Sequence, residues 1–250
     1  MCAAITAIGH LFRLILPVFS LAAFLLLTTS CRNVDEAAFD AGMKAYTSGD
    51  FKTAMEKWKP LAESGNPSAQ TNIGVMYYQG RGVEQNYKEA IRWYSMAAGE
   101  GYPDAQYNLG LAFAEGKGVE RSAEESLKWY RAAGENGYLA AQVLLGNMYT
   151  RGQGVGKDEK EGARWYQMAA EQGDSSAQFF LATAYIKGSG VEKDDGRAYM
   201  WLAVAAEEGD EQARESANLA KEELGKRMTP DQVAKAEQMA RQWLANKPTK

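Results

Sequence analysis

Apolar residues recur along the chain at helical spacing, and the whole pattern returns every 36 residues. In the first regular copy, Ala69, Ile73 and Tyr77 lie at positions i, i+4 and i+8, on one face of a helix that we call helix A. The three later copies hold equivalent residues: Ala105, Leu109 and Phe113; Ala141, Leu145 and Tyr149; and Ala177, Leu181 and Tyr185. A fixed period of this length indicates an array of stacked helix pairs.

The second half of each copy carries another helical pattern, which predicts a helix B. Its Trp-Tyr pair is flanked by small residues at three- and four-residue spacing, which favours a helix packed on two neighbours. The tryptophans lie 36 residues apart: Trp93, Trp129, Trp165 and Trp201. We therefore predict that they belong to the core and do not form a ligand-binding stripe.

A Gly-x-Gly-Val loop separates the two helices of each copy. Its first glycine follows helix A directly and provides a left-handed C-cap. The four loops begin at the same place in each copy: Gly80, Gly116, Gly152 and Gly188. The loop lacks the third glycine and the preceding strand of a dinucleotide-binding fingerprint, so we interpret it as a turn and not as a phosphate site.

Helix B begins after a preferred N-cap residue in every copy. The caps are Asn86, Ser122, Asp158 and Asp194. In the first three copies a glutamate follows three residues later: Glu89, Glu125 and Glu161. This spacing predicts capping boxes, which explains Asp158 and Glu161 better than a pair of catalytic carboxylates does.

Both ends of the array diverge from the regular pattern, as expected of capping units. Residues 31–66 contain a diverged helix pair, in which Trp58 lies 35 residues before Trp93, as if one residue were missing. Residues 67–209 hold four regular copies, and residues 210–250 hold capping helices and a polar tail. A capping box of Thr229 and Gln232 begins the last helix. The predicted fold is an all-α solenoid of about six antiparallel helix pairs.

Composition excludes several classes of function. The formal net charge of the chain is −4, which is unlike the basic face of a nucleic-acid-binding protein. No histidine or cysteine follows Cys31, and no serine is followed three places later by lysine. Cys–His and Ser–His–Asp nucleophiles, zinc sites built on His and Cys, and the Ser-x-x-Lys motif are therefore absent. We expect neither an enzyme nor a cofactor or metal site.

The first 30 residues have the pattern of an export signal, with an apolar run from Leu14 to Leu27 before small residues. Their end resembles a bacterial lipoprotein signal, which implies lipidation of Cys31. Because Arg32 follows the cysteine, the resemblance implies the outer membrane, with the protein facing the periplasm. The alternatives are a plain secretory signal, giving a soluble periplasmic or secreted protein, and an uncleaved N-terminal anchor.

The combined pattern, A-x-x-x-L-G-x-x-Y, G-x-G-V and W-Y-x-x-A-A-x-x-G, resembles the Sel-1-like repeat, a relative of the tetratricopeptide repeat. In the second copy it is carried by Ala105, Leu109, Gly110, Gly116, Gly118, Val119, Trp129, Tyr130, Ala132, Ala133 and Gly137. The resemblance implies a right-handed superhelix that serves as a protein-interaction scaffold, sometimes in envelope or polysaccharide-secretion assemblies. A cysteine-rich branch of the family is linked to β-lactam binding, but this chain lacks the disulfide that each repeat of that branch carries.

In tetratricopeptide relatives the exposed side of helix A lines a concave groove. Transferring that pattern predicts eleven partner-binding residues: Thr71, Val75, Tyr78, Tyr107, Leu111, Val143, Asn147, Arg151, Phe179, Thr183 and Lys187. Exposed apolar side chains in a groove favour a protein segment as partner. The alternatives are that these residues simply pack between copies, or that the surface binds cell-wall glycan.

Overall fold

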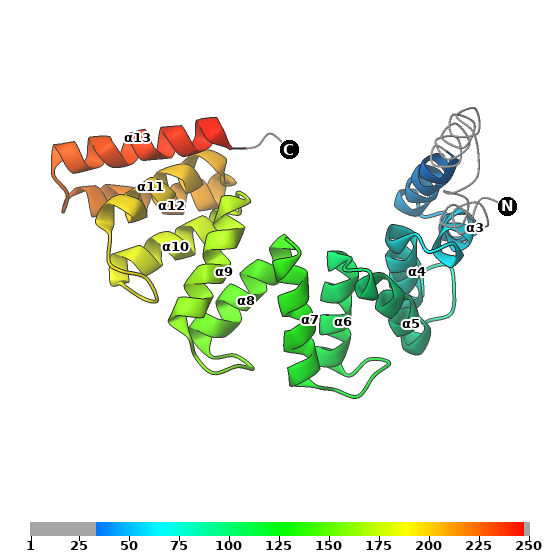
Figure 1. Cartoon of the computed structure of the whole chain (residues 1–250). Helices are drawn as coiled ribbons and strands as arrows, with labels where there is room; N and C mark the ends of the chain where they lie inside the picture. Colours follow the sequence, from blue (N-terminus) through cyan, green and yellow to red (C-terminus); the bar gives the residue numbers. More distant parts are fainter. Residues whose placement is uncertain (1–33, 248–250) are drawn as a thin grey trace, which may run out of the picture. The chain divides into compact units, whose positions relative to one another are not determined.

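The computed structural model describes residues 34–247, which contain only helices and their connections (Figure 1). No strand occurs within this range. The chain forms two compact units, an N-terminal unit that ends at Ser126 and a C-terminal unit that begins at Leu127. Consecutive helices pack on one another within each unit, which confirms the prediction of an all-α solenoid.

The N-terminal unit contains the diverged pair and the first regular copy. A helix over residues 34–47 precedes α3 (Phe51–Glu63), α4 (Pro67–Gln79), α5 (Tyr87–Gly99) and α6 (Pro103–Glu115). Helix α4 packs on α3 and α5, and α5 also packs on α6. Helices α4 and α5 therefore each have a neighbour on two sides, as the small and bulky residues of the pattern require.

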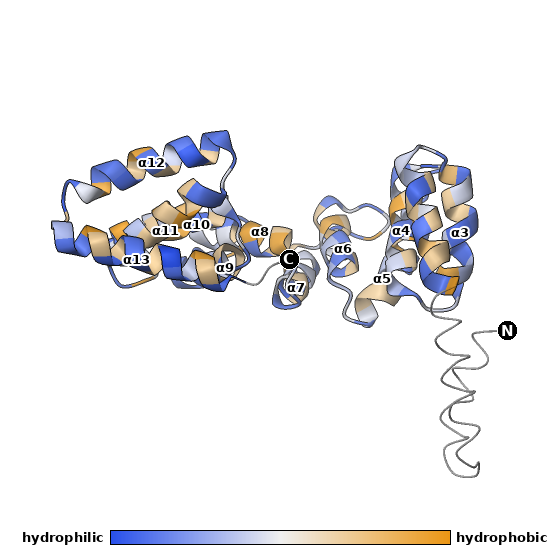
Figure 2. Cartoon of the chain, turned by 90° about the horizontal axis from the view of Figure 1, so that it is seen from above, coloured by the Kyte–Doolittle hydropathy of each residue, from blue (hydrophilic) through white to orange (hydrophobic). Residues whose placement is uncertain are grey.

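The C-terminal unit contains the third and fourth copies. Helix α7 (Ala123–Glu135) begins in the N-terminal unit and continues into this one. The others are α8 (Leu139–Arg151), α9 (Glu159–Glu171), α10 (Ser175–Lys187), α11 (Asp195–Glu208), α12 (Glu211–Gly225) and α13 (Pro230–Asn246). Most of α12 is hydrophilic (Figure 2), as befits a helix at the end of an array.

The second glycine of three of the four loops lies against the helix B of the copy before. The first glycine of each loop is left-handed at the end of helix A, as predicted. The second is left-handed too, and in three loops it lies against the first residue of the preceding helix B: Gly82 on Phe51, Gly118 on Tyr87, and Gly190 on Glu159, whereas Gly154 meets only Met148. A Cβ atom at Gly118 would lie 2.6 Å from the carbonyl of Tyr87. In these three loops the close approach holds the loop against the helix B of the copy before it.

A buried glutamine near the start of each helix A joins it to the preceding helix B. Its Nε2 donates to a carbonyl eight residues earlier: Gln70 to Ala62 at 3.0 Å, Gln106 to Ala98 at 3.3 Å, Gln142 to Gly134 at 2.9 Å, and Gln178 to Ala170 at 3.3 Å. These carbonyls belong to the last turns of helix B, and each also accepts from the backbone N–H of the glycine three residues later. The glutamine therefore gives each of these carbonyls a second hydrogen bond at the junction between the two helices.

Replacing Gln142 by methionine, which is similar in size, removes one of the two donors to the carbonyl of Gly134, while the N–H of Gly137 remains. We expect the free energy of unfolding to fall by about 0.5–1.5 kcal/mol. Chemical denaturation followed by circular dichroism measures it, with the exposed loop residue Gln153 changed to methionine as the control. Equal stability of the two variants would contradict the role given to Gln142.

The predicted register of the diverged pair was wrong. A Cβ atom at Gly42 would collide with the Trp58 ring, just as a Cβ atom at Gly74 would collide with the Tyr94 ring. Trp58 therefore occupies the place of Tyr94, 36 residues later, and not the place of Trp93. No residue is missing from its helix B; the connection before that helix is shorter instead.

The predicted capping boxes of helix B are also wrong for Glu89 and Glu161. The backbone N–H of the N-cap residue Asn86 donates to the carbonyl of Tyr77, and equivalent bonds form in the other copies. That N–H is therefore not available to a glutamate side chain. Glu89 pairs with Arg92 at 2.6 Å, and Glu161 with Arg164 at 2.9 Å. The predicted box of Thr229 and Gln232 at the start of α13 is confirmed.

The last two helices do not form a regular pair. Both α12 and α13 pack on α11, and they make few or no contacts with each other. The Trp243 ring of α13 lies edge-on against Trp201 of α11, with centroids 5.4 Å apart. Lys247 closes the end of α13 by an ion pair with Glu208 at 2.5 Å. At this end of the array, both α12 and α13 therefore cover α11.

Candidate partner-binding surface

The predicted partner-binding residues of the N-terminal unit differ in how much side chain they expose. Val75, Tyr107 and Leu111 are half-buried and retain accessible surface. Thr71 is only 5% exposed, and its hydroxyl donates to the carbonyl of Pro67 at 2.8 Å. Thr71 therefore contributes to the packing of α4 and offers almost no surface to a partner.

Tyr78 forms part of an ionic and aromatic cluster that links the first copy to the second. Its hydroxyl donates to Glu115 Oε2 at 2.7 Å, and the ammonium of Lys117 lies 2.7 Å from the same oxygen. Bonds from Lys117 and Tyr78 lower the pKa of the Glu115 carboxyl. Lys117 also lies 5.4 Å from the centre of the Tyr78 ring. This cluster gives the half-buried apolar residues of α4 and α6 a polar border.

In the C-terminal unit most of the predicted residues serve the fold. Val143 and Phe179 pack against the buried core formed by α10 and α11. The amide of Asn147 donates to the carbonyl of Val143 at 3.0 Å, and the hydroxyl of Thr183 donates to the carbonyl of Phe179 at 3.0 Å. The alternative that such residues pack between copies is therefore better supported here than in the N-terminal unit.

Arg151 and Lys187 are exposed in the last turns of α8 and α10. Cations at this position complement the negative end of the helix dipole. Neither side chain makes an ion pair among residues 34–247. Both therefore remain available to an acidic group of a partner.

The tryptophans of helix B lie inside the array. Trp165 is fully buried, and Trp93 and Trp201 are each 4% exposed, which confirms the predicted core assignment for these three. A cation covers the ring in the first three copies: Arg92 on Trp93, Lys128 on Trp129, and Arg164 on Trp165. These indoles are therefore not open platforms on which a sugar could stack.

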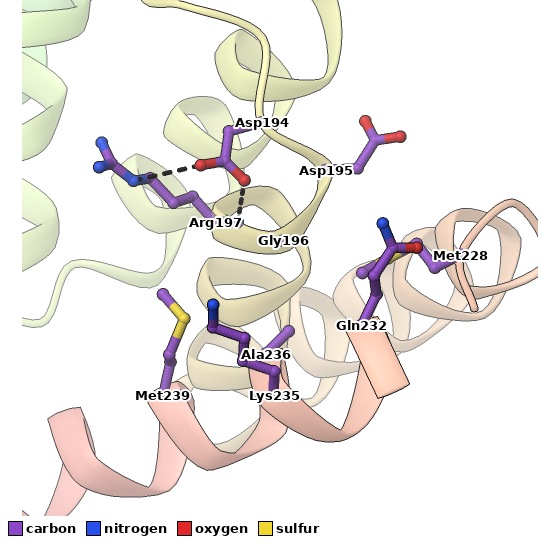
Figure 3. A pocket seen from close by; sticks show the side chains of 9 residues that line it. All are labelled: Asp194, Asp195, Gly196, Arg197, Met228, Gln232, Lys235, Ala236 and Met239. Atoms are coloured by element: carbon purple, nitrogen blue, oxygen red, sulfur yellow. Dashed lines mark hydrogen bonds and ion pairs between the residues drawn. The ribbon is translucent and has the colours of Figure 1, made fainter. Parts of the chain in front are cut away.

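A cavity of about 440 Å³ lies between the start of α11 and α13 (Figure 3). Asp194 caps α11 by accepting from the backbone N–H of Arg197 at 2.9 Å, and it also pairs with that side chain. Gln232 and Lys235 of α13 line the other wall. Asp194 and Arg197 thus serve the start of α11, and the cavity belongs to the contact between α11 and α13.

The described part of the chain holds no cluster of metal-ligating side chains. Within residues 34–247, no three acidic, histidine or cysteine side chains gather where they could hold a metal ion. Over the same residues, no helix combines the length and apolar character of a membrane span. The predicted export signal and Cys31 lie outside the described residues.

Comparison with known proteins agrees with the repeat pattern. The family model for the Sel1 repeat matches residues 67–102, 103–138, 139–174 and 175–210. No curated protein sequence matches the chain.

Two solved structures are similar over most of the chain. A Sel1 repeat protein from Oxalobacter formigenes is 31% identical with a TM-score of 0.64, and the match covers 82% of this chain and 97% of that one. A protective antigen present in uropathogenic Escherichia coli strains, which displays an SLR fold, is 29% identical with a TM-score of 0.67. That match covers 88% of this chain but 48% of the antigen, so the chain spans about half of the antigen's length.

Proposed function

Because the chain belongs to the Sel1 repeat family, whose members generally mediate protein–protein interaction, we propose that it is a non-catalytic scaffold that binds a partner protein segment along its A helices. The observation that supports this most is the half-exposed apolar set of Val75, Tyr107 and Leu111, bordered by the Tyr78 cluster. Apolar anchors with a polar border are typical of protein interfaces.

Substitution at this surface tests the proposal. Leu111→Ser with Val75→Ser removes apolar contact area on α4 and α6, and it should reduce recovery of a partner that co-purifies with the wild-type chain by at least about tenfold. Lys88→Ser with Glu124→Ser, on exposed positions of helix B, is the control. Unchanged recovery with an intact circular dichroism spectrum would argue against the surface.

Phe179 gives a contrasting prediction, because it packs against both the α10–α11 core and Ala205, Ala206 and Ala217. Phe179→Ser should lower the free energy of unfolding by roughly 1.5–3 kcal/mol, the value of burying such a side chain. Thermal melting measures this loss. If the variant melts at the same temperature as the wild type, Phe179 does not stabilise the fold and remains a candidate partner-binding residue.

The cell envelope is the proposed location. The export signal and the lipoprotein-like Cys31 support it, and the related protein from Escherichia coli is a protective antigen. Cys31→Ala should move the protein from the membrane fraction to the soluble fraction, because a single lipidated residue would be the anchor. If the variant still sediments with membranes, an uncleaved apolar segment holds it there.

A glycan-binding role is the second candidate, and the burial of the helix B tryptophans counts against it. Sugar binding by stacking needs an open aromatic face. In this chain those faces are covered by Arg92 and Arg164, at 4.2 Å and 4.3 Å from the ring centres.

A further inference from the structure

A cavity of about 370 Å³ opens on the helix B side of the first copy, within the N-terminal unit. Its lining includes Lys59 and Glu63 of α3, Tyr77 of α4, and Glu89, Arg92 and Trp93 of α5. None of these residues belongs to the surface proposed above for the partner segment. The cavity is therefore a separate candidate site.

Arg92 is fixed in this cavity from three sides. Its Nη2 donates to Glu89 Oε1 at 2.6 Å, its guanidinium lies 4.2 Å from the centre of the Trp93 ring, and its Nη1 is 3.8 Å from the sulfur of Met96. The side chain is nevertheless 52% exposed. An arginine held in this way presents its remaining N–H groups in a fixed direction, which suits the two oxygens of a carboxylate.

The cavity also holds a second cation. The buried Trp93 indole faces the Glu89 carboxyl, whose pKa is lowered chiefly by a hydrogen bond from Arg92 and further by one from Trp93. Lys59 makes no ion pair among residues 34–247. An exposed guanidinium and an ammonium on one cavity together favour an anionic ligand.

The same arrangement returns 72 residues later, within the C-terminal unit. Each of the six residues named above has an equivalent 72 positions later, and the only change of residue type is from Lys59 to Arg131. The six equivalents are Arg131, Glu135, Tyr149, Glu161, Arg164 and Trp165. Arg164 repeats the contacts of Arg92: it bonds Glu161 at 2.9 Å, covers Trp165 at 4.3 Å, and lies 3.8 Å from the sulfur of Met168. The buried Trp165 indole again faces the carboxyl of its own copy, and it contributes to the lowered pKa of Glu161. Arg131 here donates to the Tyr149 hydroxyl.

The second and fourth copies do not keep the arrangement. In the second, Phe113 and Ala132 stand in place of the tyrosine and the methionine. In the fourth, Arg197 and Met200 stand in place of the glutamate and the arginine, and Trp243 of α13 lies against the tryptophan. Packing alone does not require the arrangement, because these copies stack without it.

We propose that the first and third copies each carry a pocket that binds a carboxylate of a peptide, held by Arg92 and Lys59 in one and by Arg164 and Arg131 in the other. Glu63 and Glu135, which have no ion pair among the described residues, accept an N–H of the same peptide. The site goes beyond the proposed scaffold function and does not depend on the helix A surface.

Nuclear magnetic resonance of the ¹⁵N-labelled full chain tests the proposal through its six tryptophan indoles. The probe is the peptide acetyl-Ala-Glu-Ala-amide, and acetyl-Ala-Gln-Ala-amide is its uncharged match. The indole signals of Trp93 and Trp165 should shift saturably with the glutamate peptide, while that of Trp129 stays still as an internal control. Two further titrations compare kinds of carboxylate with the glutamate side chain of the probe peptide. N-acetylalanine presents a C-terminal carboxylate, and glutarate presents a carboxylate outside any peptide.

Variants assign the effect to each pocket. Arg92→Gln should weaken binding at Trp93 by about tenfold or more and leave Trp165 unaffected, and Arg164→Gln should do the reverse. Lys59→Met tests the first pocket without disturbing the Arg92 contacts, and Lys88→Gln is the surface-charge control. Absence of saturable shifts with every carboxylate, or equal shifts with the glutamine peptide, would overturn the proposal. The helix A test is unaffected by either outcome.

Discussion

Replacing Gly118 by alanine is expected to lower the free energy of unfolding of the N-terminal unit by about 2–5 kcal/mol. An L-residue in this left-handed conformation, with φ of +77°, costs about 1–2 kcal/mol. The added Cβ atom would also lie 2.6 Å from the Tyr87 carbonyl, and overpacking of this kind costs about 1–3 kcal/mol more. Chemical denaturation of the full chain, followed by far-ultraviolet circular dichroism, measures the loss.

Gly65 provides the matched control in the same unit. It is also left-handed, with φ of +97°, but a Cβ atom there would meet nothing within 4 Å. Gly65→Ala should therefore cost only the conformational part, about 1–2 kcal/mol. If both variants lose the same stability, the second loop glycine does not lock adjacent copies together.

Replacing Trp165 by alanine should be as damaging in the C-terminal unit. Its side chain is fully buried, and removal of such a residue costs about 3–5 kcal/mol. Because stability in an array depends on neighbouring contacts, hydrogen exchange should show the largest loss of protection in α7, α8 and α9.

Trp243→Ala is the control for that change, because Trp243 is half-buried on α13 at the end of the array. Its loss of protection should be smaller and confined to α11 and α13. Uniform loss across the C-terminal unit in both variants would contradict the picture of stability built from local contacts.

Local features of the fold could be predicted because each has a local cause. Helical spacing identified the faces that hold Ile73 and Leu109, and the glycine after helix A identified its left-handed end. Asn86 and Asp158 accept from the backbone N–H groups of their helices, as capping residues do. None of these inferences required knowledge of which copy contacts which.

The sequence pattern did not predict the features that depend on contact between copies. The repeated glutamine, exemplified by Gln142, was visible as a pattern, but its acceptor lies on the preceding helix B. The second loop glycine, such as Gly118, has the same kind of explanation. Trp58 was aligned by residue type, whereas its glycine partner Gly42 shows its true place.

The candidate surface could be predicted only in part. The pattern selects positions on helix A, but it does not show how far each side chain is covered by its neighbours. Thr71 is buried and Phe179 is packed against α12, while Leu111 keeps accessible surface. The Arg92 and Arg164 pockets had one signal in the sequence, the return of the same residues after 72 positions.

Site-specific photo-crosslinking in intact cells tests the scaffold account most directly. A photoreactive residue at Leu111, a half-buried position of α6, should capture one protein of defined mass. The same residue at Lys88, an exposed position of α5, should capture none. Capture from Lys88 but not from Leu111, Val75 or Tyr107 would contradict the claim that the A helices carry the partner surface.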